Sequence, residues 1–204
     1  MTTSNSIYPS LFFISETAAE VVVMESLIKS IAEGNQEAFQ KLYQSFAGKV
    51  YNTAISYLQN KEDAEEVTQD VFTNIYKNAT KFQGDAALST WIYRITVNTS
   101  LNAIKRKKRL SFLKFGEQSK DLPDFEHPGI LMEKKEAAKT LFKVIDTLPP
   151  NQKTAFILSF VEELPRQEVA DIMELSLKAV ESLLQRAKVN LRTKLEKQYP
   201  HRRK

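Results

Sequence analysis

The residues best suited to a chemical task in this chain are amides and cations that recur at helical spacing near its middle. Asn98, Asn102, Lys105, Arg106 and Arg109 follow an i, i+4, i+7, i+8, i+11 pattern, which places them on one face of a helix. Amide side chains can hydrogen-bond the edges of bases, and lysine and arginine bind the phosphate backbone. The pattern therefore predicts a helical surface that contacts nucleic acid.

Aromatic residues precede this polar face and add a second kind of contact. Phe82, Trp91 and Tyr93 lie just upstream of it, and Gly84 marks the segment around Phe82 as a loop. Aromatic rings stack on unpaired bases without requiring an intact duplex. We therefore expect Phe82 to contact an opened DNA strand, whereas Trp91 is expected to belong to the core rather than to contact a base.

A second candidate surface lies near the C-terminal end. The pattern predicts a short helix over 166–173, a turn at 174–176 and a long final helix, which together make a helix-turn-helix. The final helix places Val180, Leu184, Ala187 and Leu191 on one apolar face. The surface predicted to read DNA comprises a capping residue and the polar residues opposite that face: Ser176, Lys178, Glu181, Ser182, Gln185 and Arg186.

Glu181 is the residue of this surface whose charge opposes phosphate binding. We expect it either to accept a hydrogen bond from a cytosine amino group or to orient Arg186. Every amphipathic helix has a polar face, so this helix alone would not indicate DNA binding. The helix and tight turn before it favour the DNA-binding interpretation.

Composition is consistent with an anionic partner and excludes several other classes. The 204-residue chain has a formal net charge of +4 and a pI near 9.1. It contains no cysteine and only two histidines, so thiolate metal sites are excluded and no metal or other cofactor is expected. Its five glycines form no phosphate-binding loop. The apolar stretches near the start fit neither a signal peptide nor a membrane span.

Helical periodicity predicts an all-α fold made of two small helical domains. The first domain is expected over 25–110 and the second over 131–197, joined by a flexible linker at 111–130. Residues 1–24 are expected to form a disordered or weakly ordered leader, and Met24 is a candidate start of translation.

The first domain also carries an acidic face. A helix expected over 62–78 exposes four acidic or polar residues: Asp63, Glu66, Gln69 and Asp70. This face should not touch DNA, so it is expected either to be solvated or to meet a basic protein partner. The next helix is expected over 89–109, with Ser89 or Thr90 as its N-cap.

Together these segments resemble the extracytoplasmic-function group of bacterial RNA polymerase sigma factors. The run Asp63–Phe72 is similar to the family's polymerase-binding helix, Phe82–Asn98 to its promoter-melting segment, and Leu148–Leu183 to its region 4. The string Lys178–Leu183 is similar to members from Bacteroidetes. The likeness covers most of both expected domains, and the combined pattern is far more specific than the helix-turn-helix alone.

The resemblance implies a partner for each surface. The acidic helix face, with Asp63, Glu66, Gln69 and Asp70, would bind the clamp of the largest subunit of core RNA polymerase. The second domain would meet the flap of the second-largest subunit and read the promoter −35 element, although many relatives carry a basic residue where Glu181 stands. The −10 element, with one base flipped from the duplex, would be held by Lys81, Phe82, Trp91, Asn98, Asn102, Lys105 and Arg106.

The resemblance also implies that the chain is not an enzyme. The core polymerase performs the phosphodiester chemistry, so neither a catalytic residue nor a small-molecule substrate is implied. A cytoplasmic protein that is not embedded in a membrane is implied, with promoter DNA and an anti-sigma factor as further partners.

Two other classes remain open from the residues. A stand-alone helix-turn-helix transcriptional regulator would use 130–195 to read DNA and the first half as a sensor or dimerisation module. An enzyme acting on nucleic acid would need a cluster of carboxylates for metals, and the Glu65–Glu66 pair lies on a plain helix without a second cluster.

Overall fold

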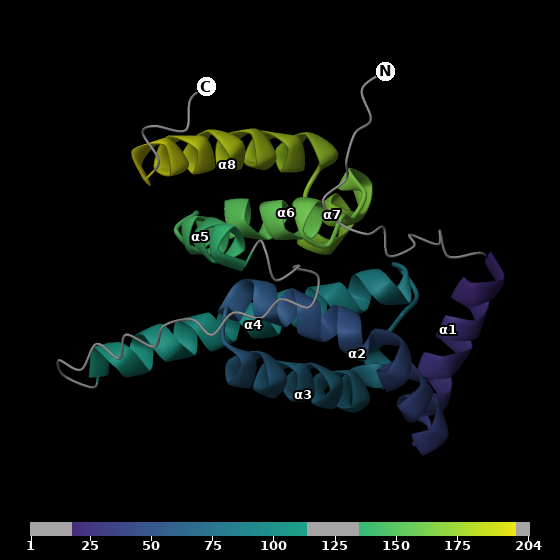
Figure 1. The fold of residues 1–204 in the computed structure, drawn as a ribbon. Coiled ribbons are helices and arrows are strands. Elements are labelled where there is room, and N and C mark those ends of the chain that lie inside the picture. Colours follow the sequence, from purple (N-terminus) through teal and green to yellow (C-terminus); the bar gives the residue numbers. More distant parts are fainter. Residues whose placement is uncertain (1–17, 114–134, 199–204) are drawn as a thin grey trace.

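A computed structural model describes residues 18–113 and 135–198, and in these residues all regular structure is helical (Figure 1). The first domain contains α1 (Ala18–Ala32), α2 (Gln36–Leu58), α3 (Lys61–Asn78), the 3-10 turn η1 (Ala79–Lys81) and α4 (Leu88–Leu113). The second contains α5 (Lys135–Asp146), α6 (Pro150–Phe160), α7 (Arg166–Met173) and α8 (Leu177–Gln198). The prediction of two small helical domains is therefore confirmed.

Asparagine caps define the helix boundaries of the first domain. Asn35 Oδ1 accepts a hydrogen bond from the amide of Ala38 at 3.0 Å, and Asn60 Oδ1 accepts one from the amide of Asp63 at 2.8 Å. Each cap satisfies an amide that the first turn of its helix leaves free. The bundle core is made by side chains that are almost fully buried: Leu42, Val50, Ile55, Val71, Ile75 and Ile92.

Turn chemistry builds the helix-turn-helix of the second domain. α6 begins at Pro150, whose missing amide costs nothing at the first helical position. α7 ends at Glu174 in the left-handed conformation (φ 55°), and the Ser176 hydroxyl accepts the amide of Ala179 at 3.2 Å, as the sequence predicts for an N-cap. Val169 and Ala170 of α7 are buried with Val180, Leu184 and Ala187 of α8.

Several predicted boundaries need correction. α1 begins at Ala18, so residues 18–24, expected in an unstructured leader, are helical. α4 begins at Leu88 and continues to Leu113, which places Ser89 and Thr90 inside the helix and its last three residues in the expected linker. α5 begins at Lys135, and the rest of the leader and linker, 1–17 and 114–134, lies outside the described residues.

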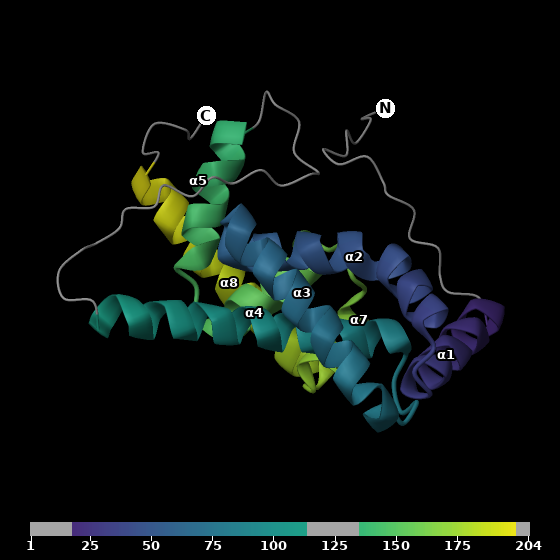
Figure 2. The same ribbon diagram turned by 90° about the horizontal axis from the view of Figure 1, so that it is seen from below.

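The two domains pack against one another through polar contacts. α5, α6 and α7 lie over α2 and α4, while α8 and α3 lie on opposite outer sides (Figures 1 and 2). Lys153 Nζ of α6 donates to the carbonyl of Tyr57 at 3.0 Å, and Gln59 Nε2 donates to the carbonyl of Phe142 at 3.0 Å. Both contacts are buried, and the buried apolar residues of the two domains belong to one cluster.

Candidate DNA interface

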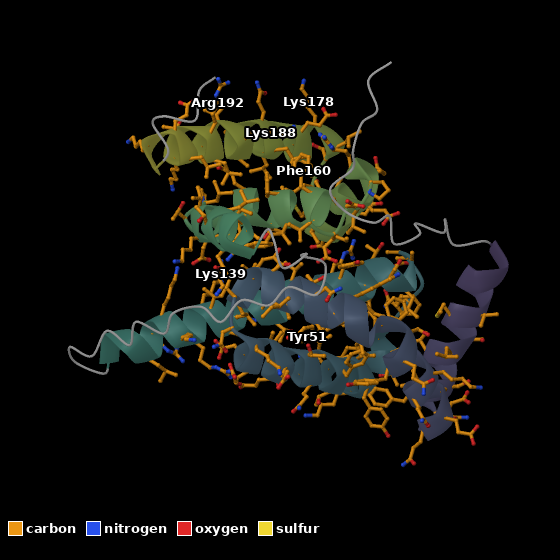
Figure 3. The ribbon with its side chains drawn as sticks, in the orientation of Figure 1. Tyr51, Lys139, Phe160, Lys178, Lys188 and Arg192 are labelled. Atoms are coloured by element: carbon orange, nitrogen blue, oxygen red, sulfur yellow. The ribbon has the colours of Figure 1, made fainter. Side chains whose placement is uncertain are left out.

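The outer face of α8 is open to solvent along its length. Its inner face is fixed by the buried Val180 and Leu184, so the residues about half a turn away point outwards. Figure 3 shows Lys178 and Arg192 directed away from α6 at the two ends of this helix. All six residues predicted to read DNA here are exposed: Ser176, Lys178, Glu181, Ser182, Gln185 and Arg186.

Arg186 is oriented by Ser182, not by Glu181. Its Nε donates to the Ser182 carbonyl at 3.2 Å, and a terminal nitrogen donates to the Ser182 hydroxyl at 3.1 Å. Of the two roles expected for Glu181, the structure thus gives the orienting role to Ser182. The guanidinium keeps further N–H groups for an acceptor on DNA.

The outer face of α4 has the predicted alignment. Asn98, Asn102 and Lys105 are exposed, whereas Ile92, Thr96 and Ser100 on the opposite side are buried in the bundle. Arg109 is exposed as well, and α4 runs past the end of the bundle (Figure 2). This arrangement presents amides first and cations afterwards along one straight surface, as contact with bases and then with backbone requires.

Phe82 and Trp91 form a ring pair at the start of this surface. Their ring centroids are 5.4 Å apart with planes inclined by 58°, and both residues are half-buried. Trp91, which was expected in the core, is therefore only half-buried, and Phe82 lies in the loop after η1, as expected. Lys81, in η1, is exposed beside them. The pair offers aromatic surface that is already held in place.

Arg94 belongs to the same face of α4 but is held by the second domain. Its Nε and a terminal nitrogen donate to the carbonyl of Asp171 at 3.2 and 2.7 Å, and a terminal nitrogen lies 3.4 Å from the Glu174 carboxylate. Arg94 lies four residues before Asn98, a spacing that would have identified it. The end of α7 thus covers part of the surface that carries Asn98.

The acidic face of α3 is partly neutralised by the basic end of α4. Glu66 Oε1 lies 2.6 Å from a terminal nitrogen of Arg106, and Asp63 Oδ2 lies 2.6 Å from Lys107 Nζ. Glu66 and Arg106, which were expected on different surfaces, therefore form one ion pair between α3 and α4. Gln69 and Asp70 are exposed on the same helix. Asp70 forms no ion pair within the described residues, so both side chains remain available to a partner.

A buried carboxyl lies between the domains. Glu162, in the turn after α6, has a fully buried Oε1 without a hydrogen-bond partner among the described residues. Burial raises the pKa of its carboxyl to about 7, although the hydroxyls of Thr53 and Tyr93 and the charge of Lys49 oppose the rise. Burial likewise lowers the pKa of Lys153, while its ion pair with Asp146 raises it. Sequence periodicity gives no sign of either group, because both depend on how the domains meet.

Other kinds of site receive no support from the described part of the chain. It contains no group of three histidine, cysteine, aspartate or glutamate side chains that could hold a metal ion. None of its helices combines the length and the apolar character needed to cross a membrane.

Comparison with known proteins matches both halves of the chain to one family. Residues 42–110 match the Sigma-70 region 2 family model and residues 139–191 match the Sigma-70, region 4 model. The first match contains the outer face of α4 and the acidic face of α3, and the second contains α8. The two regions define a protein of the sigma-70 type.

Individual relatives narrow the class further. The RNA polymerase sigma-H factor of Pseudomonas aeruginosa is 27% identical over 80% of this chain and 89% of its own. The ECF RNA polymerase sigma-E factor of Escherichia coli is 28% identical over 87% of this chain and 97% of its own. The chain therefore belongs to the extracytoplasmic-function group of RNA polymerase sigma factors.

Solved structures share the fold. CnrH, in a complex with the cytosolic domain of CnrY, is 22% identical with a TM-score of 0.62 over 84% of this chain and 96% of that one. The sigma factor RpoE, in a complex with the anti-sigma factor NepR from Bartonella quintana, is 18% identical with a TM-score of 0.56 over 81% and 98%.

Proposed function

We infer that this protein is a sigma factor, which binds core RNA polymerase, directs it to promoters through their −10 and −35 elements and helps to melt the DNA. The observation that carries this function is the presence, in one sigma-type chain, of two separate outward helix faces suited to DNA. The face on α4 combines amides, cations and a ring pair, and the face on α8 combines a capped N-terminus with polar side chains.

We propose that the α4 surface holds the −10 element in its opened form. Asn98 and Asn102 would hydrogen-bond bases, and Lys105 and Arg106 would bind backbone phosphates. Phe82 and Trp91 would stack on a base flipped from the duplex, with Lys81 beside them. Base flipping costs a few kcal/mol of stacking and pairing, which a ring pair already held in place offsets without further ordering.

We propose that the α8 surface reads the −35 element in duplex form. Lys178 and the amides at the start of α8, capped by Ser176, would bind phosphate, and Ser182, Gln185 and Arg186 would read base edges. Glu181 would accept from a cytosine amino group, since the structure leaves its carboxylate exposed.

We propose that α3 binds the clamp of the largest polymerase subunit and that the second domain meets the flap of the second-largest. Gln69 and Asp70 support the first contact most strongly because neither is paired within the described chain. Asp63 and Glu66 would join it after leaving Lys107 and Arg106.

Four further assignments follow from this function and are proposals too. The chain performs no chemistry of its own, because the polymerase supplies it. It acts in the cytoplasm, where promoter DNA and polymerase are. An anti-sigma factor binds it, as the anti-sigma factor NepR binds the structural neighbour RpoE. The string Lys178–Leu183 supports a proposed kinship with members from Bacteroidetes.

In vitro transcription tests this function directly. Core polymerase from the same organism would be mixed with a pool of genomic fragments, with and without the purified chain. We expect discrete run-off products only when the chain is present, and loss of these products with Asp70→Lys, which places a cation against a basic partner surface. Lys41→Gln, a change of charge on α2 away from all three surfaces, is the matched control.

The stand-alone regulator predicts the opposite behaviour. It would bind a promoter duplex tightly without polymerase and would add no run-off product to those of the core enzyme. That pair of results would overturn the sigma-factor assignment.

A further inference from the structure

The aromatic ring of Phe160, which lies beside α8, contacts two cationic side chains. Lys188 Nζ of α8 lies 4.8 Å from the centroid of the Phe160 ring, and the guanidinium carbon of Arg166, at the start of α7, lies 5.9 Å from it. The Phe156 ring, 4.9 Å away between centroids, supports Phe160 from within α6. Residues from α6, α7 and α8 thus meet at the Phe160 ring.

This cluster carries a positive charge that the chain does not balance. Among the described residues neither Arg166 nor Lys188 forms an ion pair, and both are exposed. Their charged groups lie within about 11 Å of each other, because both approach the same ring. That upper bound exceeds the Debye length of about 8 Å at physiological salt, so salt largely screens any repulsion between the two exposed charges. Both cations therefore remain charged at neighbouring positions and can each contact an anion.

The cluster flanks the surface proposed to read the −35 element. Successive residues of a helix are about 100° apart, so Lys188 and Arg186 lie about 200° from each other around α8. Gln185 and Lys178 project between them. Arg186 therefore stands on one side of the reading surface and the pair Arg166–Lys188 on the other. A helix in the major groove is bordered by one sugar-phosphate backbone on each side, which fits a cation on each side.

We propose that Arg166 and Lys188, held on the Phe160 ring, bind backbone phosphates of the promoter duplex on the side of α8 opposite Arg186. This inference rests on the proposed function of α8 and extends it by two residues from outside the reading surface. Phe160 acts as a positioning residue, because its ring fixes where the two flexible cations stand before DNA arrives. Such phosphate contacts set the register of the helix in the groove but carry no sequence preference.

The competing interpretation is that the cluster only stabilises the fold. An exposed cation–π contact contributes about 0.5–1 kcal/mol, so removing a cation would lower the stability of the domain by that amount. A phosphate contact has a different signature, because each neutralised phosphate releases counterions. It contributes about 0.9 to the slope of log affinity against log salt concentration.

The test uses holoenzyme made from core polymerase and the full chain, bound to a duplex that contains only the −35 half of its promoter. Binding is measured from low to moderate salt for wild type, Arg166→Gln, Lys188→Gln, the double variant and Phe160→Leu. Lys41→Gln, which removes one exposed positive charge from α2, controls for net charge. The melting temperature of each variant shows whether weaker binding comes from a lost contact with DNA or from a destabilised fold.

We expect the salt slope of the double variant to fall by about one to two units, according to whether the cations share a phosphate. Affinity should fall equally for all −35 sequences. Phe160→Leu should weaken binding and keep the wild-type slope, because the charges remain. Wild-type slopes in the double variant, with or without a lower melting temperature, would overturn the proposal. Failure of wild-type holoenzyme to prefer its own −35 sequence over a scrambled one would instead overturn the function proposed for α8.

Discussion

The two helix faces suited to DNA differ in how much of them the chain itself occupies. The outer face of α8 is exposed, and the hydrogen bonds found there among the described residues, such as that of Ser182 with Arg186, lie within α8 itself. The outer face of α4 is engaged at both ends: Arg94 is held by α7, and Arg106 is paired with Glu66 of α3. The α8 face is therefore ready to bind a duplex, whereas the α4 face must first be released.

This difference between the α8 and α4 faces matches their proposed tasks, which are reading a duplex and holding an opened strand. Reading a duplex requires only that a rigid helix present its side chains to the major groove. A surface that holds an opened strand is needed only after the two DNA strands have separated. A contact that covers this surface beforehand therefore does not prevent the protein from first binding the promoter duplex. We expect binding of the polymerase clamp to α3 to draw Glu66 away from Arg106, and separation of the domains to free Arg94.

The largest expected effect concerns pH and the packing between the domains. The carboxyl of Glu162 has a pKa of about 7 in the packed form, against an ordinary value of 4.5. Packing therefore favours the protonated form: its contribution is complete below pH 4.5 and is lost as the pH rises through 7, by up to about 3 kcal/mol. Tyr93 faces it and stays neutral over this range, because burial raises the pKa of its hydroxyl.

Dyes attached to the two domains would report this loss as an increase in their separation between pH 5 and pH 8. Glu162→Gln should abolish the pH dependence and keep the domains packed at pH 8. Glu163→Gln, a change at the exposed neighbour, should behave like wild type. An equal pH dependence in both variants would assign the effect to another group.

The second prediction separates opening of the DNA from recognition of the duplex. Phe82→Ala and Asn98→Ala should reduce open complexes, detected as permanganate-reactive thymines, since each stacked base contributes about 1–3 kcal/mol. Binding of the same holoenzyme to a −35 duplex should be unchanged, because α8 carries neither residue. A template with a pre-melted bubble should partly rescue Phe82→Ala. Equal loss on both templates would indicate a general folding or binding defect.

The third prediction tests sequence reading by α8. Arg186→Ala should cost about 1–3 kcal/mol and relax the preference at one −35 position, if the guanidinium contacts a guanine. Glu181→Arg should raise affinity for all duplexes and alter the preferred sequence, because it removes a repulsive charge. Selection from a randomised −35 library measures both effects, and unchanged preferences in both variants would mean that this face does not read bases.

The fourth prediction concerns the contact that covers α4. Arg94→Gln removes a charged donor from the Asp171 carbonyl and the ion pair with Glu174. Since the side chain is partly exposed, the packing should weaken by about 1–2 kcal/mol. The separation between dyes on the two domains should increase at pH 6. If it stays as short as in wild type, α7 does not depend on Arg94 for its position.

Much of this arrangement was predictable from local sequence signals. The spacing of Asn98 and Asn102 correctly gave one exposed face, and Ser176 correctly gave the cap of α8, because both depend on one helix only. The partners of Glu66, Arg94 and Glu162 were not predictable. Their environments arise where helices distant in sequence meet, and charge pattern alone suits a solvated side chain equally well.

The smallest expected effect comes from the ion pairs between α3 and α4. Both partners of the Glu66–Arg106 pair are about half exposed, with side-chain exposures of 55% and 51%. Glu66→Gln should therefore lower the stability of the first domain by no more than about 1 kcal/mol. It should nevertheless weaken polymerase binding if Glu66 joins the clamp contact. Urea unfolding and a pull-down with core polymerase distinguish the two effects.

The most direct test of the account is the distance between α3 and α8 before and after polymerase binds. The chain contains no cysteine, so Lys77→Cys and Thr193→Cys can carry a pair of dyes at exposed positions on these helices without further changes. We predict a short separation in the free chain and a clearly longer one in the holoenzyme, as Arg94 leaves α7. The same separation in both states would contradict the claim that α7 covers the Arg94 end of the α4 face until polymerase binds.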